Sequence, residues 1–321
     1  MLKLLHSRNV IAWIVFMMIF LATKASFFFQ IPGATSYSDF VALQYVRPIV
    51  LSDTWAFCII MIIQFVICLW IGFLINKLEI VEHHSLIPST VSALLLSVFT
   101  TFFRWNGFYL VMILALLLLN ILLRIKKERP SHYACFFAGL CQGCMTVLMP
   151  TAIIGLPFLH WALYTSKKQG LRGYLLIYIG FLIPFYFYYA LLYIVGFSII
   201  PFHSWLDSFG HFGGYIEFLD RFAIVPIILT TILCGAFINI VLGKLIFGKR
   251  QMVRVLLFYG IGLLLMVPFF VTTQTSVFLL WVFPITLIIS IILLRLKKSL
   301  LVESAFGIFV IGIIILSILK I

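Results

Sequence analysis

Acid–base chemistry in this chain would depend on very few carboxylates, because only nine of its 321 residues are Asp or Glu. None of the nine lies inside a long apolar run. Asp39 stands out in the stretch Ser36-Tyr37-Ser38-Asp39-Phe40, shortly after the first apolar run. A carboxylate in that place could act as a base and take a proton from a hydroxyl group. The alternative is that Asp39 caps a surface helix that starts at Phe40.

Three arginines stand apart from the basic clusters of the chain: Arg47, Arg104 and Arg221. The guanidinium group binds phosphate oxygens in a bidentate fork, so these side chains are candidates for holding a phosphate. Arg104 is followed by Trp105, so stacking and snorkelling along an apolar surface explain it equally well.

His203, Asp207 and His211 are spaced four residues apart, which would place them on one face of a continuous helix. Such a face could bind a metal ion, but Gly210 interrupts the helix before His211. A polar loop tip is therefore favoured, and we expect no metal site. Nucleotide-binding, serine-hydrolase and zinc-protease motifs are also missing from the sequence, so we expect no cofactor.

The pair Cys141 and Cys144 has the spacing of a redox motif but lies within an apolar stretch. Gly139 and Gly143, four residues apart, are typical of close packing between helices in a membrane. All six cysteines fall in apolar runs, so we expect no disulfide framework. Polar residues in such runs should form hydrogen bonds between helices; they are Gln64, Asn120, Gln142 and Asn239.

The elements that must position these residues are apolar helices. Hydrophobic residues make up 64% of the chain and charged residues only 10%. A water-exposed surface needs about 25% charged residues, so we predict an all-α, polytopic transmembrane helical bundle that forms one domain over residues 1–321. The sequence predicts about eleven spans, at residues 10–29, 54–76, 86–103, 107–123, 132–149, 151–166, 173–197, 222–243, 255–272, 277–294 and 304–319.

The orientation of these spans follows from a hairpin between Arg124 and Arg172, which begins and ends with basic clusters. Between Pro130 and Lys167 no residue is charged, and Pro150 marks the turn between two spans. Basic residues favour the inner side of a membrane, and 17 of the 22 Lys and Arg then fall inside. The N-terminus is predicted to lie inside, and Asp39, Arg47, Arg104 and Arg221 fall outside.

Two further consequences come from this arrangement. Lys24, near the outer end of the first span, is expected to snorkel to the membrane surface. The formal net charge of +13 is explained by topology and by contact with membrane lipids, so we expect no binding of nucleic acid. The expected location is the bacterial cytoplasmic (inner) membrane, with the first span retained as an uncleaved anchor.

The hairpin also carries a resemblance. Residues Phe137 to Gly143, Met149-Pro150-Thr151-Ala152, Leu156-Pro157 and Lys167-Lys168 look like the central hairpin of C-type glycosyltransferases, and Trp281 to Pro284 resembles their late hairpin. The layout is also similar to an uncharacterised family of bacterial integral inner-membrane proteins. The chain departs from the glycosyltransferase pattern at Phe40, where a second acidic residue is usual, and at Met149, where a basic residue is common.

The resemblance implies an enzyme that uses a polyprenyl-phosphate-linked sugar at the outer membrane face, in envelope or surface-glycan assembly. Asp39 would then be the catalytic base, and Arg104, Arg221 and Arg47 would bind the lipid phosphate. Two alternatives remain open at this point. One is a non-catalytic subunit that scaffolds an envelope complex with protein partners, and the other is a transporter of lipid or small solutes.

Overall fold

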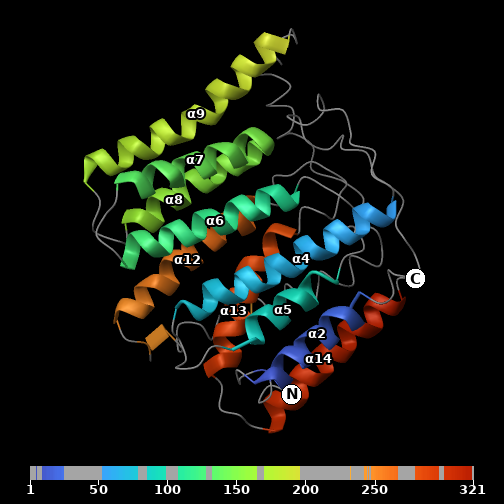
Figure 1. Cartoon of the computed structure of the whole chain (residues 1–321). Helices are drawn as coiled ribbons and strands as arrows, with labels where there is room; N and C mark the ends of the chain where they lie inside the picture. The colour runs from blue at the N-terminus through green and yellow to red at the C-terminus, as the bar shows by residue number, and fades with distance from the viewer. Residues whose placement is uncertain are drawn as a thin grey trace.

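The computed structural model is mainly helical over its described residues, which are 5, 9–24, 53–78, 85–98, 108–127, 132–164, 170–195, 232, 242–243, 245, 247–266, 279–295 and 300–319. No strand occurs in these ranges. The helices, shown in Figure 1, are α2 (Val10–Ala22), α4 (Asp53–Asn76), α5 (Ile87–Leu95), α6 (Phe108–Lys127), α7 (His132–Leu148), η2 (Pro150–Ile154), α8 (Gly155–Tyr164), α9 (Leu171–Val195), α12 (Phe247–Met266), α13 (Leu279–Arg295) and α14 (Leu300–Leu319).

Six of the predicted spans correspond to helices with nearly the same bounds, namely α4, α6, α7, α9, α13 and α14. The predicted break at Pro150 is confirmed, because α7 ends at Leu148 and Met149 has extended backbone angles before the 3-10 helix η2 begins. A proline at the start of η2 is favourable, since the first turn of a helix needs no amide donor at that position.

Three helices differ from the prediction. Helix α5 ends at Leu95 rather than near residue 103. Just after its last residue, Ser97 donates its hydroxyl hydrogen to the Leu94 carbonyl and closes the final turn. Helix α2 ends at Ala22 and is followed by a turn at Thr23 and Lys24. Helix α12 begins at Phe247, eight residues before the predicted start at residue 255, and so includes a basic stretch in its first turns.

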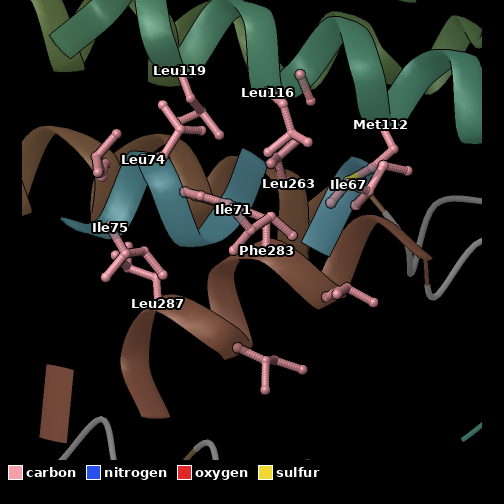
Figure 2. Close-up of a cluster of buried hydrophobic side chains, with 14 of the residues drawn as sticks. Ile67, Ile71, Leu74, Ile75, Met112, Leu116, Leu119, Leu263, Phe283 and Leu287 are labelled. Carbon is pink, nitrogen blue, oxygen red and sulfur yellow. The ribbon is translucent and has the colours of Figure 1, made fainter. Parts of the chain in front are cut away.

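The core of the bundle lies around α4, which packs between α6 and α13. Figure 2 shows side chains from these helices and from α12 pointing toward one another: Ile67, Ile71, Leu74, Ile75, Met112, Leu116, Leu119, Leu263, Phe283 and Leu287. All are buried, and close packing of this kind supplies the dispersion energy that holds helices together where lipid removes the hydrophobic driving force.

The outside of the bundle is apolar as well. On α9 the side chains of Leu182, Tyr186 and Phe187 are 60%, 71% and 65% exposed, and on α2 Ile14 and Met18 also face outward. Within the described ranges, two helices are long and apolar enough to cross a bilayer, at Phe57–Asn76 and Leu171–Ile194. Outward-facing apolar side chains on such helices are what a hydrocarbon environment requires.

Helices α7 and α9 approach each other backbone to backbone at three glycines. A Cβ atom at Gly143 would lie 3.0 Å from the Cα atom of Phe181 and still closer to its carbonyl oxygen. Gly139 faces the Ile177 carbonyl in the same way, and Gly180 on α9 faces the Phe136 carbonyl. The predicted role of Gly139 and Gly143 in close helix packing is therefore confirmed.

Candidate functional site

The residues that the sequence put forward for catalysis and phosphate binding are Asp39, Arg47, Arg104 and Arg221, and all four lie outside the described residues. The same holds for His203, Asp207 and His211. Within the described ranges, no group of three His, Cys, Asp or Glu side chains is close enough to hold a metal ion. The polar groups that the structure does bring together lie inside the bundle.

Lys24 is the centre of the first polar group. Its side chain is fully buried, with the ammonium nitrogen 5.7 Å from the centroid of the Phe20 ring. It is the one fully buried charged side chain among the described residues. The expectation that Lys24 snorkels to the surface is wrong, because α2 ends at Ala22 and the turn that follows directs the side chain into the bundle.

Four side chains from α4, α5 and α6 are connected to Lys24, Cys68 directly and the other three through Cys68. Cys68 on α4 is close enough to Lys24 for a direct electrostatic interaction, and its thiol is a hydrogen-bond partner of the Ser92 hydroxyl on α5. One turn earlier on α4, Gln64 donates an amide hydrogen to the phenol oxygen of Tyr109 on α6, over 2.6 Å. All four are buried. We call Lys24, Gln64, Cys68, Ser92 and Tyr109 the lysine cluster.

The lysine cluster is held in place by small and polar residues on facing turns of α4 and α5. The Ser89 hydroxyl occupies the space that a side chain at Gly72 would fill. One turn further along α4, the Asn76 amide donates to the Ser85 carbonyl over 2.9 Å and accepts from the Ser85 backbone N–H over 3.2 Å. Small residues at four-residue intervals allow close approach, which brings Ser92 alongside Cys68.

The burial of Lys24 makes the lysine cluster a candidate site. Charged side chains are seldom fully buried, because removing a charge from water is costly, so a fully buried lysine is a candidate functional residue. An ammonium group beside a thiol, with an amide, a phenol and a hydroxyl group linked to that thiol, suits an anionic or oxygen-rich ligand.

A second polar group spans the break between α7 and α8. Gln142 donates its side-chain amide to the Ala152 carbonyl on η2 over 2.5 Å. Its side-chain oxygen accepts a hydrogen bond from the Tyr259 hydroxyl on α12 over 2.7 Å, and its backbone carbonyl accepts one from the Thr146 hydroxyl. Gln142 on α7 therefore connects η2, on the other side of the break, with α12, and its role is structural. We call Gln142, Thr146, Ala152 and Tyr259 the clasp.

The predicted hydrogen bonds between helices are confirmed for Gln64, Gln142 and Asn120, the last of which accepts from the Lys77 ammonium over 3.1 Å. Asn239 lies outside the described residues. Nothing in the sequence pointed to Tyr259 as the partner of Gln142, since 117 positions separate them. None of the cysteines in the described ranges, Cys141 and Cys144 among them, forms a disulfide bond.

Replacing Tyr259 with Phe should lower the free energy of unfolding by about 1–2 kcal/mol, because the Gln142 side-chain oxygen would lose its buried partner. The measurement is reversible unfolding of the full chain in mixed micelles. Tyr164→Phe is the matched control, because Tyr164 is 73% exposed and should lose little. An equal effect of the two substitutions would contradict the role assigned to the clasp.

Comparison of the chain with protein-family models, with curated proteins and with solved structures finds no match.

Proposed function

We propose that the chain is a multi-pass protein of the bacterial cytoplasmic membrane that acts in envelope or surface-glycan assembly. It crosses the membrane about eleven times with its N-terminus inside, and it resembles a C-type glycosyltransferase in transferring sugar from a lipid phosphate at the outer face. Two helices of membrane-crossing length and the outward-facing apolar side chains of α2 and α9 support the membrane placement.

The observation that carries this proposal is the lysine cluster. Lys24 follows the last turn of α2, and the predicted outer loop with Asp39 comes next in the chain. A buried ammonium group beside Cys68, with the polar pair Gln64 and Tyr109 linked to that thiol, offers a positive charge and polar partners. A phosphate or pyrophosphate on a long lipid needs this combination of positive charge and apolar surroundings.

The roles of the residues follow from the chemistry of sugar transfer. Asp39 takes the proton from the acceptor hydroxyl, whose oxygen then bonds to the anomeric carbon of the sugar. The bond between that carbon and the phosphate oxygen breaks, and the lipid phosphate leaves with the electron pair. Arg47, Arg104 and Arg221 bind the phosphate and stabilise the negative charge that develops on it.

Lys24→Gln tests the proposal because it removes the charge and keeps a polar side chain of similar length. We expect the release of lipid phosphate from a lipid-linked sugar, measured in membranes that contain the full chain, to fall about tenfold or more. Lys77→Gln is the control, since Lys77 comes directly after the C-terminal end of α4, away from the lysine cluster, and its ammonium group donates a hydrogen bond to Asn120. Turnover that is unchanged by Lys24→Gln, in a strain where deletion abolishes it, would sink the proposal.

A second candidate function is transport of a lipid or small solute, and the depth of the lysine cluster favours it. Gln64 and Cys68 lie near the middle of the membrane-length segment Phe57–Asn76. Helix α5 has nine residues, all buried, and is too short to cross a bilayer. Short helices beside polar groups at the bilayer midplane are typical of transporter binding sites.

Reconstitution of the purified chain in vesicles separates the possible functions. Release of lipid phosphate shows transfer, whereas movement of an unaltered lipid-linked sugar between leaflets shows transport. If neither occurs and the chain co-purifies stably with envelope proteins, the non-catalytic scaffold is correct.

A further inference from the structure

Helices α8 and α12 pack with a regular register that can be followed from one end to the other. A Cβ atom at Gly262 would lie 2.9 Å from the Phe158 side chain, so these two positions face each other. One turn back on α12, the Phe258 ring stacks on the Trp161 ring with centroids 4.5 Å apart and planes 17° apart. A step of four residues back on α12 thus matches a step of three residues forward on α8.

Extended by one more turn of each helix, the register set by these two contacts pairs Arg254 of α12 with Tyr164 of α8. Arg254 is exposed, Tyr164 is 73% exposed and Trp161 is 51% exposed. Figure 1 shows the end of α8 and the starts of α9 and α12 toward the left of the molecule. The register thus groups the guanidinium group of Arg254 with two aromatic rings at this end.

These three side chains have the composition of a lipid-headgroup site. Trp and Tyr favour the interface between hydrocarbon and water, where an apolar ring meets polar groups. The guanidinium group binds phosphate in a bidentate fork, and each basic side chain near a membrane surface adds attraction for anionic lipids. Under the predicted topology this end lies at the inner face of the membrane, where Arg254 would meet anionic headgroups.

We propose that Arg254, Tyr164 and Trp161 form a binding site for the headgroup of an anionic phospholipid in the inner leaflet. Arg254 contacts the phosphate, the Tyr164 hydroxyl hydrogen-bonds to the glycerol region, and the Trp161 ring lies against the upper acyl chain. The site depends on the membrane placement of the chain and not on the sugar-transfer chemistry.

The test uses quenching of tryptophan fluorescence by brominated lipids. The full chain is reconstituted in phosphatidylcholine vesicles that contain a small fraction of brominated phosphatidylglycerol or brominated phosphatidylcholine. The Trp161 contribution is the difference between the chain and its Trp161→Phe variant. We expect the anionic lipid to bind next to Trp161 about fivefold more strongly than the zwitterionic lipid at low salt, and less so at high salt.

Substitutions at Arg254 decide the origin of the preference. Arg254→Gln should reduce the ratio of anionic to zwitterionic lipid bound next to Trp161 to about one. Arg254→Lys should keep most of this preference because the charge remains. Lys77→Gln, which removes a charge just after α4, should leave the preference for the anionic lipid unchanged. Equal quenching by the two lipids, or a preference that survives Arg254→Gln, would overturn the site even in a chain that still turns over lipid-linked sugar. If neither lipid quenches Trp161, both this site and the membrane placement of α8 are wrong.

Discussion

Asp39→Asn should reduce the turnover of a lipid-linked sugar by at least about a hundredfold, because general-base catalysis contributes roughly 10² to 10⁴ in rate and an amide cannot accept the proton. The side chain keeps its size, so substrate binding should change little. The measurement is the rate of lipid-phosphate release in vesicles that contain the purified chain, together with the surface-glycan profile of the complemented deletion strain.

The matched control for this experiment is Asp53→Asn. Asp53 is the first residue of α4 and lies in the same predicted outer region, and the proposal gives it no part in the transfer. This change should leave turnover near the original rate and alter stability by only a few tenths of a kcal/mol. If the two substitutions have the same effect on turnover, Asp39 is not the base and the glycosyltransferase proposal fails.

Gly143→Leu should have the largest effect on stability, because α7 and α9 touch through their backbones at this point. The new side chain would collide with the backbone of Phe181, which is part of α9 and cannot move aside as a side chain can. Overpacking of a well-packed contact costs about 1–3 kcal/mol and more where backbone must shift, so we expect a loss of at least about 3 kcal/mol. Thermal unfolding followed by circular dichroism in mixed micelles measures it.

Gly312→Leu on α14 is the control, because no described residue beyond the adjacent turns of its own helix lies within 4 Å of a Cβ built there. The substitution is the same and the residue is again inside a helix, so any general effect of leucine in place of glycine is removed. This variant should be as stable as the original chain or slightly more so, since glycine is the poorer helix former. Comparable losses in both variants would show that the α7–α9 contact is not close.

The helices could be predicted from the sequence because continuous apolar runs between basic residues leave few alternatives. The bounds of α4, α9 and α13 follow from those runs, and the break at Pro150 follows from the geometry of proline. Helix α5 was not predictable, since Phe99 to Phe103 continues the apolar pattern past Leu95. Hydropathy reports whether a segment avoids water and does not report where a helix ends.

The lysine cluster was not predictable for a different reason. Lys24 lies near the end of an apolar run, where snorkelling is the common outcome for a lysine. Its burial depends on α4, α5 and α6, which follow it by about 30 to 100 residues. Likewise, Gln142 could be recognised as a hydrogen-bonding residue, whereas its partner Tyr259 is set by the packing of α12 against η2.

Helix α5 imposes an order on the synthesis of the protein. Its nine residues are enclosed mainly by α4, α13 and α2, so no part of it faces lipid or water in the finished bundle. Helix α13 begins about 180 residues later in the chain, which corresponds to about 10–40 s of translation at ~5–20 residues per second. During that interval the side of α5 that packs against α13 in the finished bundle must be sheltered by the insertion machinery or by a chaperone. A nascent chain that stops before Leu279 leaves this segment uncovered and exposes it to membrane proteases.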